Sequence, residues 1–271
     1  MPDFQPSLRC PTCLRLEALV KNAHAALDVE DLENPVFEEL VSFALTHEDH
    51  EFYHLDGDLI QRVRQVFFQH TFALENAWSH RLLRSESMTF KDYPQYPIYT
   101  QLCEHLHQKI QQHAPLANLF LFVGGGPLPS TALILANEKG YKGHIIDSHS
   151  QACTCSGCLI KKLGIKNLSV ETACGCHFGY EHFPIIILAA QAGLDEKTKD
   201  LIIARIEKTA RPNTLILLRS SKGVRRLLYP EVRRTNFGSL KVIEEESPEK
   251  DTLSHLVILR KSEYGHQKLA C

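Results

Sequence analysis

The sequence is organised around Asn118-Leu-Phe-Leu-Phe-Val-Gly-Gly-Gly-Pro-Leu-Pro-Ser-Thr-Ala-Leu-Ile-Leu-Ala136, which a short turn separates from His144-Ile-Ile-Asp147. An apolar run of strand length ends at three glycines. An apolar segment of helical length then leads to a second strand, which ends in an acidic residue. This order is typical of the β-α-β unit that opens a nucleotide-binding fold.

The glycine loop and the acidic residue predict the kind of ligand. At Gly124, Gly125 and Gly126 the backbone can approach a ligand without a Cβ in the way, and a helix that begins near Pro127 would offer free N–H groups there. Asp147 lies 21 positions beyond Gly126, where such folds place a carboxylate on the two ribose hydroxyls of an adenosine. We therefore predict a ligand that carries a nucleoside, with a plain tight turn as the alternative.

The loop also discriminates between nucleoside cofactors. Gly124 and Gly126 match the first part of the dinucleotide fingerprint, but Pro129 replaces its third glycine. This replacement argues against NAD and FAD. S-adenosylmethionine (SAM) fits the loop better.

Length and composition set the outer bounds. The chain has 271 residues, of which 44% are hydrophobic and 23% charged, so it can bury the core of one large or two small domains. A net charge of −2 and a pI near 6.7 give no signature of binding to nucleic acid or to a membrane surface. Residues 1–11 are polar and no apolar run approaches the ~20 residues of a membrane span. We predict a cytoplasmic protein and leave a homodimer open.

Seven of the nine cysteines form three groups: Cys10-Pro-Thr-Cys13, then positions 153, 155 and 158, then positions 174 and 176. Without a secretory signal they are expected to be reduced thiols. Their pairs lack the regular spacing of a zinc ribbon, so we predict free thiols and no metal site. A structural metal site and redox chemistry are the alternatives.

The first part of the chain has helical patterns and the rest alternates strands with helices. We predict an all-helical N-terminal domain over residues 1–114, packed over the mouth of a Rossmann-like, doubly wound SAM-binding domain over residues 115–271. The predicted helices are 14–27, one that starts at Asn34-Pro35, 59–83, 100–112, 153–163 and 195–208. The further predicted strands are 167–171, 183–190, 214–218, 241–243 and 256–260.

In an open parallel sheet the ligand lies at the carboxyl ends of the strands. Gly124, Asp147, Ala190 and Arg219 all follow or end predicted strands. We therefore expect these four residues to lie together around one crevice.

Glu75 stands out in the helix predicted for residues 59–83. Phe68, Phe72, Trp78 or Ser79, and Leu82 recur with it at steps of three and four, so the glutamate shares a helix face with large apolar side chains. Such a carboxylate either reaches solvent at the edge of the face or is partly buried. Burial would raise its pKa and make it a base able to deprotonate an ammonium group.

Two further segments could bind a polar substrate. Asp92-Tyr-Pro-Gln-Tyr-Pro-Ile-Tyr99 is rich in prolines that favour an extended chain, and its tyrosine hydroxyls could orient a substrate or simply pack. Arg219-Ser-Ser-Lys-Gly-Val-Arg225-Arg-Leu-Leu-Tyr-Pro230 follows a predicted strand. Its guanidinium groups suit the carboxylate of an amino-acid ligand, and a solvated basic turn is the alternative.

Three blocks of sequence resemble the signature blocks of the nicotianamine synthase family. They are Phe122-Val-Gly-Gly-Gly-Pro-Leu-Pro129, Leu188-Ala-Ala-Gln-Ala-Gly-Leu194 and Leu218-Arg-Ser-Ser-Lys-Gly-Val-Arg-Arg-Leu-Leu-Tyr-Pro230. That family includes plant and archaeal enzymes and bacterial relatives that build opine-type metallophores. The resemblance covers residues 72 to 258, and the first seventy residues match only as helical sequence.

The resemblance implies a SAM-dependent 3-amino-3-carboxypropyl transferase. In such an enzyme an amine attacks the methylene carbon next to the sulfonium of SAM, 5′-methylthioadenosine (MTA) leaves, and an aminobutyrate unit is transferred. The step requires no metal, and the product would be a nicotianamine-like metallophore for metal homeostasis. The acceptor stays open between SAM itself, histidine, glutamate and another amino acid.

The resemblance also implies roles for individual residues. The family's catalytic glutamate falls on Glu75 and its tyrosine on Tyr99, with Tyr96 as the choice of a shifted alignment. Arg219 and Arg225 would bind carboxylates. The residues implied to bind SAM are Gly124, Gly125, Gly126, Pro127, Asp147 and Ala190.

Two other functions compete with this one. An ordinary SAM methyltransferase is compatible with Asp147 and would release S-adenosylhomocysteine. A non-enzymatic, thiol-rich metal-binding protein that keeps the nucleotide fold would retain zinc and leave SAM intact.

Overall fold

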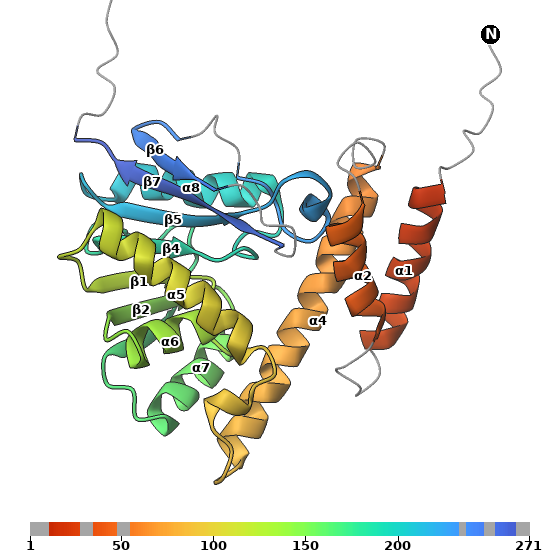
Figure 1. Cartoon of the computed structure of the whole chain (residues 1–271), viewed down its shortest axis with the longest axis horizontal. Coiled ribbons are helices and arrows are strands. Elements are labelled where there is room, and N and C mark those ends of the chain that lie inside the picture. Colours follow the sequence, from red (N-terminus) through yellow and green to blue (C-terminus); the bar gives the residue numbers. More distant parts are fainter. Residues whose placement is uncertain (1–10, 28–34, 48–54, 233–236, 247–252, 264–271) are drawn as a thin grey trace, which may run out of the picture.

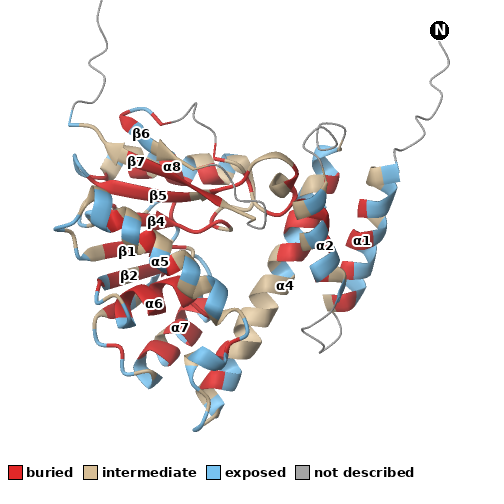
Figure 2. Ribbon diagram, in the orientation of Figure 1, coloured by how far each residue is buried: buried red, intermediate tan, exposed pale blue. Residues whose placement is uncertain are grey.

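The computed structural model describes residues 11–27, 35–47, 55–232, 237–246 and 253–263. Predictions that involve Cys10 and Asn34 lie outside these residues. A twisted sheet has helices on both faces, and helices from the first part of the chain stand to one side of it (Figure 1). Buried residues run along the strands and along the inner faces of the helices (Figure 2).

The sheet has seven strands in the order β3-β2-β1-β4-β5-β7-β6. Strands β1 to β5 pair in parallel, whereas β7 runs antiparallel to both β5 and β6. The strands are β1 (Leu119–Val123), β2 (Lys142–Asp147), β3 (Leu168–Thr172), β4 (Ile185–Leu188), β5 (Leu215–Ser220), β6 (Leu240–Glu245) and β7 (His255–Lys261). The chain order reverses between β1 and β4, which is where doubly wound sheets bind ligands.

The connections between the parallel strands distribute the helices over the two faces of the sheet. The chain moves from β1 outward to β3 through α6 (Ser130–Asn137) and α7 (Ser150–Lys162), and in the opposite direction through α8 (Glu196–Thr209). Helix α5 (Tyr96–His113) packs beside α6, on the face opposite to α8 (Figure 1). The predicted Rossmann-like α/β fold is thus confirmed.

The helices that precede β1 are divided between two cores. Helices α1 (Pro11–Leu27), α2 (Pro35–Thr46) and the first half of α4 (Gly57–Arg84) form a small core with the turn η2 (Gly223–Leu227), whereas α5 packs on the sheet. The end of α4 and the short turn η1 (Phe90–Asp92) also lie on the sheet side. The predicted boundary after residue 114 does not follow this division, and as a domain boundary it stays a prediction.

Arg64 ties the small core to the sheet. Its guanidinium donates to both carboxylate oxygens of Glu196 at 2.9 and 2.7 Å and to the carbonyl of Arg226 at 2.9 and 2.7 Å. Only 2% of the Arg64 side chain is exposed. Because the planar guanidinium is almost fully paired, its charge is tolerated at this depth.

Several helix starts differ from the predictions. Helices α1 and α7 each begin three residues earlier than predicted, at Pro11 and Ser150. Helix α5 begins at Tyr96, four residues before the predicted start, because Pro97 lies in the first turn, where a missing N–H costs nothing. Helix α6 begins at Ser130 and not near Pro127. The residue before a proline is disfavoured in the helical conformation, so Pro129 delays the helix by keeping Leu128 out of it.

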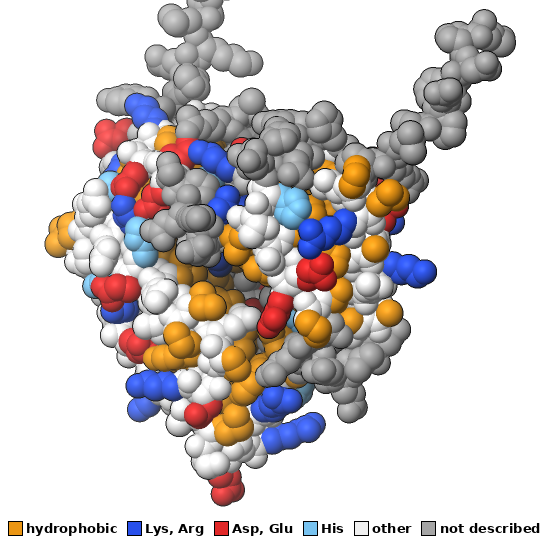
Figure 3. Space-filling view, turned by 45° about the vertical axis from the view of Figure 1, so that its right-hand side comes forward, with side chains coloured by type: hydrophobic (Ala, Val, Ile, Leu, Met, Phe, Trp, Pro, Cys, Tyr) orange, Lys and Arg blue, Asp and Glu red, His pale blue; other side chains and the backbone are white. Residues whose placement is uncertain are grey.

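Among the described residues, no helix is both long enough and apolar enough to cross a membrane. On the face shown in Figure 3, basic and acidic side chains are scattered and do not gather in one patch.

Candidate active site

A pocket of about 400 Å³ opens at the carboxyl ends of β1 and β4. This volume lies in the range of small-molecule sites, roughly 300–1,000 Å³. The pocket brings together eight of the predicted site residues: Glu75, Tyr99, Gly124, Gly125, Gly126, Asp147, Ala190 and Arg219. The four residues expected from the strand ends therefore do lie around one crevice.

The glycine loop leaves room for its neighbours as well as for a ligand. Gly124 and Gly126 have φ angles of 87° and 64°, a conformation that side chains disfavour. A Cβ on Gly124 would lie 2.9 Å from that of Ala192, and one on Gly126 would lie 2.7 Å from Oε2 of Glu75. Because these two residues lack a side chain, the loop after β4 and the glutamate of α4 can both pack close to the end of β1.

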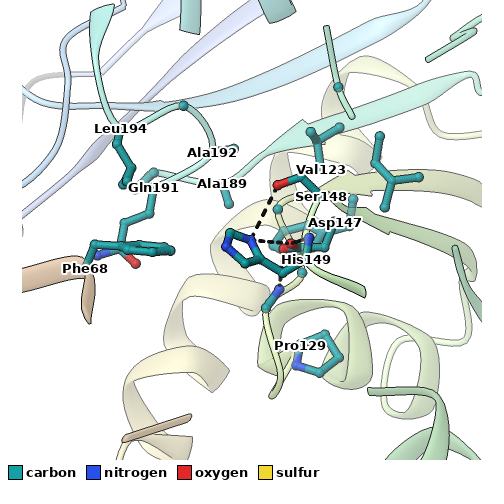
Figure 4. Close-up of a pocket in the computed structure, with 18 of the residues that line it drawn as sticks. Phe68, Val123, Pro129, Asp147, Ser148, His149, Ala189, Gln191, Ala192 and Leu194 are labelled. Carbon is teal, nitrogen blue, oxygen red and sulfur yellow. Dashed lines mark hydrogen bonds and ion pairs between the residues drawn. The ribbon is translucent and has the colours of Figure 1, made fainter. Parts of the chain in front are cut away.

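Asp147 ends β2 and braces the glycine loop. Its Oδ2 accepts a hydrogen bond from the N–H of Gly126 at 2.8 Å, and its Oδ1 accepts one from the N–H of His149 at 2.9 Å. Figure 4 shows Asp147, Ser148 and His149 together on one side of the pocket. A carboxylate has about four lone-pair sites, so Asp147 keeps capacity for ligand hydroxyls.

Glu75 faces the pocket from α4. Burial raises the pKa of this carboxyl from 4.5 to about 8, the negative charge of Asp147 adds to the increase, and the hydrogen bond from Tyr99 opposes it. The hydroxyl of Tyr99, on the first turn of α5, donates to Oε1 of Glu75 at 3.4 Å. Burial holds the pKa of Tyr99 well above its ordinary value, so that this hydroxyl stays a donor at neutral pH.

Arg219 and Tyr229 close the pocket on the β5 side. The Arg219 side chain donates through Nε and Nη2 to the hydroxyl of Ser254 at 3.2 and 2.9 Å. Burial raises the pKa of Tyr229, while the positive charge of Arg219 lowers it. A guanidinium fixed on one side in this way can present its remaining N–H groups to a ligand carboxylate.

Three predicted site residues are not among those that line the pocket. Tyr96 donates to Oε1 of Glu138 at 2.5 Å, away from Glu75. Pro127 is buried, and its carbonyl accepts the hydroxyl of Ser79 at 2.6 Å. Arg225 lies on the turn η2, partly buried.

Other pocket residues were not predicted as site residues. They are mainly aromatic or polar side chains: Phe68, Phe72, His149, Gln191 and Tyr229. A signal existed for the two phenylalanines, because they share the helix face of Glu75. Gln191 and Tyr229 lie within two of the blocks that resemble the family, but nothing in those blocks marked them as site residues. No signal existed for His149.

No disulfide bond joins the described cysteines. Burial raises the pKa of Cys153, whose Sγ donates to the carbonyls of Asp147 and Glu171. Cys174 and Cys176 line the pocket, and burial raises the pKa of Cys176 to about 11. Among the residues that the structure describes, no group of three or more His, Cys, Asp or Glu side chains could hold a metal ion.

Comparison with known sequences identifies relatives of this chain. The sequence model of the family described as nicotianamine synthase protein matches residues 15–266. Nicotianamine synthase 2 of Arabidopsis thaliana is 27% identical over 179 residues, which cover 62% of this chain and 55% of that protein. Nicotianamine synthase 9 of Hordeum vulgare is 23% identical over 188 residues, which cover 62% of this chain and 53% of that protein. The match thus spans about half the length of these curated relatives.

Solved structures share the fold. A glutamate-to-glutamine mutant of MtNAS in complex with S-adenosylmethionine superposes with a TM-score of 0.75 at 20% identity, over 90% of this chain and 97% of that one. MtNAS in complex with MTA and tNA superposes with a TM-score of 0.76 at 20% identity, over 91% of this chain and 97% of that one. Magnesium protoporphyrin IX methyltransferase from Synechocystis PCC 6803 superposes with a TM-score of 0.51 at 13% identity, over 74% of this chain and 98% of that one.

The family model covers nearly the whole described structure, and the same fold recurs over almost the full length of MtNAS. The glycine loop, the acidic end of β2 and the glutamate of α4 lie together in one pocket of that fold. This chain belongs to the nicotianamine synthase family.

Proposed function

We propose that this protein is a SAM-dependent transferase that moves the 3-amino-3-carboxypropyl group of SAM to an amine and releases MTA. The observation that carries the proposal is the Glu75 carboxyl, held beside the glycine loop with a pKa of about 8 and paired with Tyr99. A base beside that loop can take the proton that an ammonium group must lose before its nitrogen attacks SAM. Solved relatives that hold SAM, or MTA and tNA, support the same reading.

The pocket fits SAM as a substrate. In this proposal Asp147 binds the ribose hydroxyls through the lone pairs that its backbone partners leave, and Gly124 to Gly126 let the ligand approach the end of β1. Acidic residues outnumber basic ones along the lining, where Glu75, Asp147 and Asp195 face the single guanidinium of Arg219. Such a balance suits the positive charge of a sulfonium.

The chemical step needs a free amine in line with the reacting carbon. Glu75 in its ionised form takes one proton from the acceptor's ammonium group, and the amine nitrogen then attacks the methylene carbon next to the sulfonium. The N–C bond forms, the C–S bond breaks, and its electron pair returns to sulfur as neutral MTA leaves. The carboxyl finally releases its proton to solvent.

The base is suited to this task by its environment. General-base catalysis is most effective when the pKa of the base lies near the working pH, and burial places the pKa of Glu75 near 8. Tyr99 orients the carboxylate by donating to Oε1. Arg219 binds a substrate carboxylate and so helps to set the amine and the carbon in line.

The acceptor is SAM or an amino acid such as histidine, and the product is a nicotianamine-like metallophore made in the cytoplasm. The acceptor and the product are proposed from the family resemblance, and the cytoplasmic location from the polar residues 1–11 and the lack of an apolar run of membrane-span length. Incubation of the purified protein with SAM, with and without a pool of amino acids, followed by mass spectrometry of the products, tests the whole. MTA with a product heavier by one aminobutyrate unit supports the proposal, whereas S-adenosylhomocysteine identifies a methyltransferase and intact SAM excludes turnover.

A further inference from the structure

Gln191 is a pocket residue to which the proposed mechanism gives no task. It lies in the loop between β4 and α8 and lines the pocket. Its amide nitrogen Nε2 is buried and has no hydrogen-bond partner among the described residues. A buried amide donor without a partner is costly, so native proteins seldom retain one unless a ligand or water completes it.

The loop that carries Gln191 is fixed on both sides. The buried ammonium group of Lys199 donates to the carbonyl of Ala190 at 2.7 Å, and the N–H of Ala192 donates to the carbonyl of Ala189 at 3.2 Å. Contacts on both neighbours therefore hold the backbone at residue 191 in place. A donor on such a support is preorganised for a ligand.

The position of Gln191 indicates which ligand it meets. Figure 4 shows its side chain beside Phe68 and farther from Asp147 and Ser148. The ring of His149 lies between them, 6.3 Å from the ring of Phe68. The nucleoside of SAM is assigned to the Asp147 side in the proposed function. Gln191 and Phe68 are thus left for the second molecule in the pocket.

The charges of the lining support this assignment. The proposed reaction brings two carboxylates into one pocket, one on SAM and one on an amino-acid acceptor. Among the described lining residues, Arg219 is the only lysine or arginine. The described lining thus has no second lysine or arginine for the other carboxylate, and the amide of Gln191 is a buried donor that is still unpaired.

We propose that Gln191 is a specificity-determining residue that donates a hydrogen bond from Nε2 to the carboxylate of the amine acceptor, with Phe68 covering that end of the site. This inference rests on the proposed function. It defines the acceptor class as an α-amino acid, a class that includes SAM itself, and excludes simple amines without a carboxylate.

Two substitutions test the inference. Gln191→Leu removes the donor at similar size, and Gln191→Glu replaces it with a charge that repels a carboxylate. Gln101→Leu, at an exposed position of α5, is the matched control. MTA release is followed with an equimolar mixture of the twenty common amino acids and with SAM alone, and SAM affinity is measured by calorimetry.

We expect Gln191→Leu to raise the acceptor concentration for half-maximal MTA release about tenfold and Gln191→Glu to raise it further. The dissociation constant of the first SAM molecule should stay within twofold, as should every value for Gln101→Leu. If Gln191→Leu weakens the affinity for the first SAM molecule as much as it raises the half-saturating acceptor concentration, Gln191 contacts the nucleoside and the inference is overturned. An unchanged half-saturating acceptor concentration would overturn it too. If the wild type releases no MTA at all, the proposed function fails and the inference fails with it.

Discussion

The hydroxyl of Tyr99 lies 3.4 Å from Oε1 of Glu75, while Oε2 of the same carboxylate faces Gly126. The glutamate comes from the long helix α4, the tyrosine from the first turn of α5, and the glycine from the loop after β1. This arrangement places a titratable carboxyl at the strand end where doubly wound sheets bind their ligands.

Replacing Glu75 with glutamine should abolish turnover and leave SAM affinity near normal. The amide keeps the size and shape of the side chain but cannot accept the proton of the ammonium group. Steady-state release of MTA and calorimetric titration with SAM measure the two effects separately.

Glu104→Gln serves as the control, because this exposed carboxylate of α5 pairs with Lys139 outside the pocket. It should retain wild-type turnover. Wild-type turnover in the Glu75→Gln variant would remove Glu75 from the mechanism.

Turnover should rise with pH through an apparent pKa near 8. The general base must be ionised, and Glu75 becomes ionised in the free protein only as the pH passes about 8. A profile of kcat/KM against pH reports the free enzyme. A plateau that already begins near pH 5 would show that the pKa of the base is not raised.

The same shift makes the stability of the fold depend on pH. Folding raises the pKa of Glu75 from 4.5 to about 8. The contribution of this carboxyl to the stability of the folded state is therefore fully present below pH 4.5 and is lost as the pH rises through 8. Glu75→Gln abolishes that loss. The variant should therefore gain thermal stability relative to wild type between pH 5 and pH 9, a comparison for calorimetric scans.

The two tyrosines of the proline-rich segment should differ in effect. Tyr99→Phe removes a hydrogen bond to a charged group, worth ~1.5–3 kcal/mol, and should lower kcat by about 10- to 100-fold. Tyr96→Phe should change kcat by less than about twofold, since this hydroxyl bonds to Glu138 outside the pocket. Equal losses in both variants would contradict the assignment of Tyr99.

Asp147→Ala should weaken SAM binding by ~1.5–3 kcal/mol. Asp147→Asn should weaken it less, because the amide oxygen still accepts one of the bonds from Gly126 and His149. The exposed Glu86→Ala variant is the control for a lost carboxylate. A normal dissociation constant for Asp147→Ala would place the ribose elsewhere.

Arg64→Met should lower the free energy of unfolding by about 3–5 kcal/mol, because it leaves the partly buried Glu196 without its partner. The double variant Arg64→Met with Glu196→Gln should lose less than the sum of the two single changes. Urea unfolding at neutral pH measures both. Additive losses would mean that the two side chains do not interact.

Much of this structure was predictable from local patterns. The apolar run before Gly124 and the acid at Asp147 are one β-α-β unit, so sequence spacing alone predicted both. Glu75 was predictable as well, since the step of three to four residues placed it on an apolar helix face. Its role, however, came from the family resemblance, because periodicity alone favoured a carboxylate without a catalytic role.

The remainder depends on contacts between distant segments. The starts of α5 and α6 depend on Pro97 and Pro129. A proline is compatible with the first turn of a helix and also with the residues before it, so the sequence alone does not fix where these helices begin. Tyr229 and Gln191 reach the pocket only because the loops after β5 and β4 meet there. No local period marks such residues.

The fate of isotopic label in SAM tests the central claim most directly. SAM labelled in its 3-amino-3-carboxypropyl group and SAM labelled in its methyl group are each incubated with the protein and an amino-acid pool, and the products are analysed by mass spectrometry. The account predicts that the first label moves to the amine product while the methyl label stays in MTA. A methyl label in the product, with S-adenosylhomocysteine released, would contradict it.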